Sequence, residues 1–157
     1  MIQYAGFVPD PFTVVLFGLL AAIAAIDARH GIIPDWATFA IAAIGLFRAA
    51  VASQPVWILS LSAIAAFAII FLAHELFHHW RGVSGLGMGD IKFIAGAVFW
   101  IGVTGLPNMI LIAAISALTF LLLRACAGLI FAPKTRIAFG PRLTVGLAYV
   151  SLFGTFH

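Results

Sequence analysis

The chain has 157 residues and a formal net charge of +3, and 64% of its residues are hydrophobic while only 8% are charged. A soluble domain usually carries about 25% charged residues, so this composition excludes an ordinary soluble domain and indicates an integral membrane protein. The length fits one domain, 1–157, and the basic residues lie scattered between apolar segments, which is typical of membrane topology and not of nucleic-acid binding.

Six apolar segments follow one another, and each is expected to form a helix because a helix satisfies its own backbone groups in lipid. The first is expected to be a retained span and not a signal peptide, since residues 1–11 contain no Lys or Arg. The fourth is short and is interrupted by Gly96, Gly102 and Gly105. The predicted spans are 11–28, 35–52, 56–76, 90–105, 107–131 and 137–153. The expected fold is an all-α polytopic membrane protein with about six transmembrane helices.

The loops between these segments alternate in charge. The turns at 53–55 and 105–107 carry no basic residue, whereas the other loops carry Arg29, Arg81, Lys134 and Arg136. The positive-inside rule places the basic loops in the cytoplasm and both termini outside. Asp27 then ends an inward-running helix and Asp90 begins an outward-running one, so both carboxylates are expected at the cytoplasmic face.

Asp27 and Asp90 form the first candidate site, because the chain has only five acidic residues and an ionisable group at the edge of a span indicates function. Two carboxyls that meet in a low-dielectric site share a proton. The ionised one can draw a proton from a water that attacks a peptide carbonyl, while the protonated one donates to the carbonyl oxygen. Gly87 and Gly89 are expected to allow close approach and positive φ. The structural alternative is that each Asp caps a helix end, Asp90 as an N-terminal cap.

The motif His74-Glu75-x-x-His78 is a second candidate. On a helix it places two imidazoles one turn apart, with a Glu positioned as base for a zinc-bound water, which is the pattern of a zinc metalloprotease. A third ligand would have to come from His79, Asp90 or Asp27. The structural alternative is a polar helix end at the level of the lipid headgroups. A third hypothesis is a non-enzymatic membrane scaffold or ion-relay subunit that uses the two aspartates.

The segment from Gly31 to Asp35 predicts a turn followed by a helix start. Pro34 directly before a helix is a start signal, and Asp35 complements the positive helix N-terminus. The turn is expected to hold the end of the first span near the second. Lys92 lies two residues after Asp90. It is expected either to shift the pKa of that acid or contact a lipid phosphate, or simply to follow the positive-inside rule as a basic residue at the cytoplasmic end of a span.

Taken together, these motifs resemble the prepilin leader peptidases, which are GxGD membrane aspartic proteases. The short chain is similar to the branch that serves Tad/Flp-type pili in bacteria. The resemblance extends from about residue 24 to residue 146. It rests on Asp27 with Arg29 and Ile33-Pro34, on Gly87-Met88-Gly89-Asp90-Ile91-Lys92, and on Ala138-Phe139-Gly140-Pro141.

The resemblance implies an aspartic endopeptidase that removes the basic leader of a prepilin at the cytoplasmic face of the bacterial inner membrane. Its partners would be the prepilin substrate helix and the lipid bilayer, with no nucleic acid, metal or cofactor. The catalytic residues would be Asp27 and Asp90, and the supporting residues Gly87, Gly89, Lys92, Pro34 and Asp35.

The chain also departs from the family pattern. Asp35 stands where the family commonly has Asn, and Arg142 stands where the residue after Gly-Pro is usually apolar. Larger members carry a cysteine-rich zinc insert and also N-methylate the trimmed pilin. Because Cys126 is the only cysteine, we expect no such insert and no cysteine-based zinc module.

Overall fold

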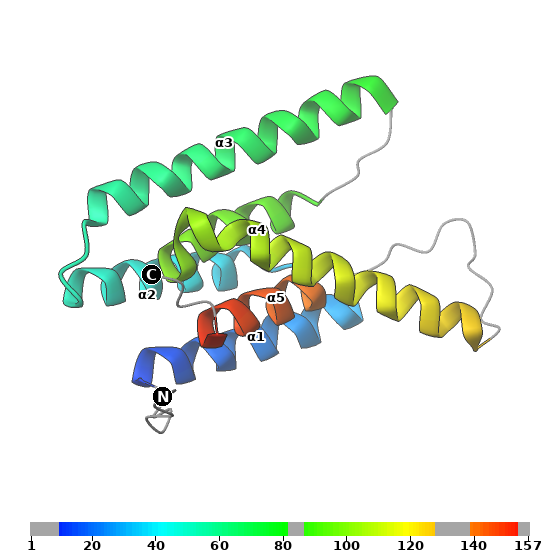
Figure 1. Ribbon diagram of the computed structural model, residues 1–157, viewed down its shortest axis with the longest axis horizontal. Coiled ribbons are helices and arrows are strands. Elements are labelled where there is room, and N and C mark those ends of the chain that lie inside the picture. The colour runs from blue at the N-terminus through cyan, green and yellow to red at the C-terminus, as the bar shows by residue number, and fades with distance from the viewer. Residues whose placement is uncertain (1–9, 82–86, 128–138, 154–157) are drawn as a thin grey trace, which may run out of the picture.

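The computed structural model describes residues 10–81, 87–127 and 139–153, and the regular structure in these ranges is helical throughout (Figure 1). The predicted all-α class is therefore confirmed, and the first three helices begin at the residues predicted. The helices are α1 (Pro11–His30), α2 (Asp35–Val51), α3 (Val56–Arg81), α4 (Met88–Cys126) and α5 (Gly140–Phe153).

Local sequence signals delimit α1. Asp10 is its N-cap, and the Asp10 carboxylate accepts a hydrogen bond from the Thr13 N–H at 3.0 Å. The helix ends at Gly31, whose φ of +66° is the left-handed conformation that favours glycine. The Gly31 N–H donates to the carbonyl oxygen of Asp27 at 2.8 Å. Asp27 is thereby fixed in the last turn of α1.

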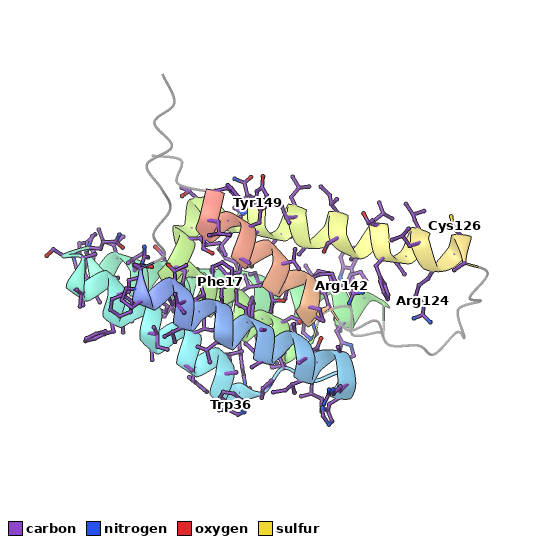
Figure 2. All side chains as sticks on the ribbon, turned by 90° about the horizontal axis from the view of Figure 1, so that it is seen from below. Phe17, Trp36, Arg124, Cys126, Arg142 and Tyr149 are labelled. Carbon is purple, nitrogen blue, oxygen red and sulfur yellow. The ribbon has the colours of Figure 1, made fainter. Side chains whose placement is uncertain are left out.

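The predicted fourth and fifth segments are joined in one element, α4. Gly102 interrupts this helix with φ +66° and ψ 175°, a conformation open essentially only to glycine. The chain turns back on itself here, so that 88–101 and 103–126, the first and second arms of α4, run in opposite senses (Figure 1, Figure 2). The sequence predicts the break at Gly105 and Pro107, whereas Pro107 lies inside the second arm. The chain reverses at Gly102 because glycine is essentially the only residue type that tolerates the dihedral angles of this turn.

In the part of the chain that the structure describes, three helices are long and apolar enough to cross a membrane: Pro11–His30, Val56–Trp80 and Met88–Cys126. α2 has 17 residues and α5 has 14, which is short of the roughly 20 that a full span needs. Large apolar side chains are exposed along α3, with Leu72 at 69% and Trp80 at 80%. Apolar exposure on this scale indicates contact with lipid. The chain is a helical membrane protein, but these helices do not confirm the predicted count of six spans.

α4 is the central element, since it contacts α5, α2 and α3, while α1 packs against α5 and α2. The second arm of α4 and α5 approach closely at Gly146, where a Cβ would lie 2.5 Å from the carbonyl oxygen of Met109. Only glycine permits this contact. The packing brings the start of α5 to the end of α1. The largest fully buried side chains are Phe93, Leu16, Ile23, Ile41, Ile91, Met109, Leu143, Leu147 and Val98.

Arg48 ties three elements together at the other end of α1. Its Nε donates to Asp10 Oδ2 at 3.4 Å, and its guanidinium lies 5.5 Å from the centroid of the Trp100 ring. Burial raises the pKa of Asp10, but hydrogen bonds from Thr13 and the charge of Arg48 outweigh burial, so the net pKa lies below its ordinary value. The cluster fixes the start of α1 against the end of α2 and the end of the first arm.

Candidate active site

Asp27 is a buried carboxylate, with only 4% of its surface exposed. Its Oδ2 accepts a hydrogen bond from the backbone N–H of Gly140 at 2.9 Å. Gly140 is the first residue of α5, so this N–H is one of the amides that a helix start leaves without a partner in its own helix. A Cβ on Gly140 would lie 2.5 Å from the same carboxylate oxygen. Glycine at this position is therefore what lets the start of α5 reach Asp27.

Asp90 is the third residue of α4, at the start of the first arm. Its Oδ2 accepts a hydrogen bond from the Gly87 N–H at 3.1 Å, which satisfies one amide at the helix start. The structural alternative weighed for Asp90, a cap at the helix N-terminus, therefore describes one part of what this carboxylate does.

Gly87 and Gly89 serve close approach, and the expectation of positive φ for them is wrong. Gly87 is extended, with φ −73° and ψ 148°, and Gly89 lies inside α4. In the described residues, positive φ occurs at Gly31, Gly102 and Ser53. A Cβ on Gly89 would lie 3.1 Å from Ile33 Cβ and 3.4 Å from the Ile33 carbonyl oxygen. The glycine thus lets the start of α4 pack against the turn after α1.

Pro34 and Asp35 lie where the sequence predicts a helix start. Pro34 is the N-cap of α2, and Asp35 occupies the first turn. Because Ile33, one residue earlier, touches Gly89, the turn holds the end of α1 near the start of α4 as well as near α2.

Lys92 pairs with Asp35, as its Nζ lies 2.8 Å from Asp35 Oδ1. Neither of the two roles predicted for Lys92 includes this contact. Both side chains are partly exposed, so the pair is of the kind that contributes about 0–1 kcal/mol to stability. Its clearer effect is to join the first turns of α2 and α4.

The carboxylates of Asp27 and Asp90 are close enough to interact electrostatically. Arg142, in the first turn of α5, also interacts electrostatically with Asp27. The end of α1 thus meets the start of α5 directly, and the turn after α1 meets the start of α4. The N-terminal ends of both helices favour negative charge. Two carboxyls in such a place can hold one negative charge and one proton together. This combination suits general acid–base hydrolysis.

The His74-Glu75-x-x-His78 motif lies on the last turns of α3. The two histidine rings are parallel, with centroids 6.4 Å apart, and Glu75 and His78 are exposed. In residues 10–81, 87–127 and 139–153, no group of three or more His, Cys, Asp or Glu side chains is arranged to hold a metal ion. The donor set that the zinc hypothesis requires is thus not assembled in these ranges.

Sequence reasoning missed the contacts of Gly140 and Arg142 with Asp27, although both residues lie in or beside a quoted motif. A glycine directly before a proline that starts an apolar segment is a usable signal for such a contact. Its backbone N–H lies at a helix start, and another side chain can approach it because glycine has no Cβ. Ala138 of the same motif lies outside the described residues, as do the loop cations Lys134 and Arg136.

Comparison with known proteins places these residues in context. Residues 14–122 match the type IV leader peptidase family. The prepilin leader peptidase/N-methyltransferase of Burkholderia pseudomallei strain K96243 is 33% identical over 170 residues, covering 96% of this chain and 50% of the relative. The enzyme of the same name from Dickeya chrysanthemi is 35% identical, covering 82% of this chain and 46% of the relative.

A shorter relative, leader peptidase HopD of Escherichia coli, is 30% identical over 85% of this chain and 86% of its own length. The chain thus spans about half the length of the two longer relatives and most of HopD. No solved structure matches the chain significantly. The matched segment contains Asp27 and Asp90 but ends before α5.

Proposed function

Because the chain belongs to the type IV leader peptidase family, we propose that it is an aspartic endopeptidase that removes the leader peptide from type IV (Flp-like) prepilins. The observation that carries the proposal is the placement of two carboxylates, Asp27 at the end of α1 and Asp90 at the start of α4, near enough for their charges to interact. Both lie within the matched residues 14–122.

The chemistry follows from a pair that holds one proton. The ionised carboxylate takes a proton from water, and the water oxygen bonds to the peptide carbonyl carbon. The protonated carboxyl donates its proton to the carbonyl oxygen, which gives a tetrahedral diol. The first carboxyl then protonates the amide nitrogen, the second takes a diol proton, and the C–N bond breaks. The products are an acid and an amine, and the pair regains its starting charge.

The residues around the pair would act by holding it. Gly87 donates to Asp90, and Gly89 lets the turn after α1 pack against the start of α4. Pro34 caps α2, and the Lys92–Asp35 pair joins α2 to α4. The Gly89 contact restrains the distance between the end of α1 and the start of α4, on which proton sharing depends. The other contacts fix the starts of α2 and α4.

The membrane arrangement that fits this activity has six spans, with the two arms of α4 as the fourth and fifth. The active site then lies at the cytoplasmic face of the bacterial inner membrane, where basic loops are expected. Cysteine labelling tests this arrangement in a Cys126→Ser background. An impermeant reagent applied from outside should label Ser53→Cys and miss His30→Cys. Labelling of His30→Cys from outside would invert the arrangement.

The substrate is proposed to be a prepilin whose helix packs between α1 and α4, so that its leader junction meets Asp27 and Asp90. HopD, which this chain covers almost fully, is named a leader peptidase, and the longer relatives are named prepilin leader peptidases.

Co-expression with a candidate prepilin tests the proposal, with leader removal read from gel mobility. Asp27→Asn and Asp90→Asn should each abolish cleavage while the protein still inserts, because an amide neither accepts nor delivers the proton. The double variant should be no worse than either single one. Full cleavage by both single variants would favour the ion-relay hypothesis. Loss of cleavage in EDTA and in a His74→Ala/His78→Ala variant, restored by zinc, would favour the metalloprotease.

A further inference from the structure

The two carboxylates of the candidate site have different surroundings. Asp27 receives the amide of another helix, since the Gly140 N–H reaches its Oδ2 at 2.9 Å from the first residue of α5. Within the described ranges, Asp90 accepts a hydrogen bond from its own helix start, from the Gly87 N–H at 3.1 Å. The start of α5 therefore adds a donor and a positive helix end to Asp27.

Cations are also distributed unequally between the two acids. Arg142 lies two residues after Gly140 in the first turn of α5, and its charge acts on Asp27. Lys92 is the cation nearest in sequence to Asp90, but it is engaged by Asp35 at 2.8 Å. Among the residues that the structure describes, the cation that acts on the pair is thus Arg142, on the side of Asp27.

Arg142 is held in place by an aromatic ring. Its guanidinium lies 4.2 Å from the centroid of Phe120 in the second arm of α4, a distance typical of a cation–π contact. Arg124 lies over the same ring at 5.7 Å. Figure 2 shows Arg142 at the start of α5 and Arg124 near the far end of α4.

Other charged groups lie on the elements around Asp27. On α1 itself, Arg29 and His30 are exposed, and His30 Nδ1 lies 3.2 Å from the Ile26 carbonyl oxygen. From α2, Asp35 faces Lys92, and from α4, Asp90 is the partner acid. Burial favours the neutral form of a carboxyl. The Gly140 amide and the Arg142 charge are the two contacts that oppose burial at Asp27.

We infer that Gly140 and Arg142 hold Asp27 as the ionised member of the pair, so that Asp27 takes the proton from water and Asp90 gives its proton to the carbonyl oxygen. This assignment rests on the proposed peptidase function. Arg142 is then a positioning residue that compensates charge without touching the substrate. The step balances: water supplies the hydroxyl that bonds to the acyl carbon, and Asp27 gains the water proton. The C=O double bond becomes a single bond, and its oxygen takes the proton that Asp90 loses.

The test is the pH dependence of kcat/KM, measured on purified full-length enzyme with one prepilin as substrate. The acid limb of this profile reports the first proton lost by the pair. Arg142→Gln should move the acid limb to higher pH by about one unit, because an opposite charge nearby favours ionisation. Arg142→Lys keeps the charge and should hold the limb near its wild-type position. Arg124 lies over the same Phe120 ring, so Arg124→Gln is the matched control. It should leave the pH profile unchanged.

Each result separates the assignment from its alternatives. Movement of the alkaline limb in Arg142→Gln, with the acid limb fixed, would make Asp90 the base and overturn the inference. Loss of activity by the same factor at every pH would reduce Arg142 to a structural role and also overturn it. These outcomes leave the peptidase proposal intact, provided that Asp27→Asn and Asp90→Asn abolish cleavage. Cleavage by those two variants would remove the function on which the assignment rests.

Discussion

Gly140→Ala is the substitution that most directly tests whether the start of α5 builds the site. The added Cβ would lie 2.5 Å from Asp27 Oδ2, which is 0.9 Å short of the 3.4 Å where ordinary contact begins. It would also meet Asp27 Cγ at 2.8 Å. Because Asp27 is buried and lies in the last turn of α1, its side chain has little room to retreat. The carboxyl, the start of α5, or both must shift by a large part of an ångström.

Such a shift has two measurable consequences. A misplacement of about 1 Å at a catalytic group lowers the rate by roughly 10²-fold, and we expect prepilin cleavage to fall by about that factor. Overpacking a buried contact costs about 1–3 kcal/mol, so the thermal midpoint of the detergent-solubilised protein should fall as well. Rate should be measured by leader removal over time, and stability by the unfolding midpoint.

Gly18→Ala is the matched control, because a Cβ on Gly18 in α1 meets nothing within 4 Å. This variant should cleave normally and be slightly more stable, by about 0.5–1 kcal/mol, since alanine loses less conformational freedom in a helix than glycine does. If Gly140→Ala cleaves as fast as Gly18→Ala, the contact between α5 and Asp27 does not shape the active enzyme, and the reasoning is refuted.

Three further predictions follow from single contacts. Gly89→Val should lose more cleavage than Gly89→Ala, because the extra methyls press on Ile33, already 3.1 Å from the first Cβ; equal activity of the two variants would contradict this role. Gly102→Ala should destabilise the fold by about 1–3 kcal/mol, since its φ of +66° and ψ of 175° suit only glycine; an unchanged unfolding midpoint would mean that the reversal of α4 does not depend on Gly102. Asp10→Ala should cost about 1 kcal/mol at neutral pH, as expected for a lost N-cap. Folding lowers the pKa of Asp10 below its ordinary value of 3.8. The stability that ionised Asp10 contributes is therefore fully present above pH 3.8 and fades as pH falls below that value. A stability difference between wild type and Asp10→Ala that persists unchanged in strong acid would argue against an ionised cap.

The sequence by itself determines the helical class, the starts of the first three helices and the membrane character. These features are encoded locally: an unbroken apolar run, a cap such as Asp10 and a left-handed terminator such as Gly31 act within a few residues. The same local signals put Asp27 at the end of one helix and Asp90 at the start of another. The candidate acids are therefore identifiable before any folding is known.

Other features are decided only by how the helices pack. The sequence offers Gly96, Gly102, Gly105 and Pro107 as breaks near one another, and only the packed chain turns back at Gly102. Gly89 is needed because Ile33 of another segment lies against it, and Lys92 finds Asp35 of α2. No periodicity or cap encodes these partners, since each belongs to a different segment of the chain.

The contact between Gly140 and Asp27 shows the physical reason most clearly. The two residues are 113 positions apart along the chain, yet the Gly140 N–H lies 2.9 Å from the Asp27 carboxylate. The sequence makes this contact sterically allowed by placing a glycine at the start of a helix. It is realised because Gly146 lets α5 pack tightly against the second arm of α4, while α5 also packs against α1. Local free energies select helices and their ends, whereas the carboxylate's partners depend on the summed packing of three helices.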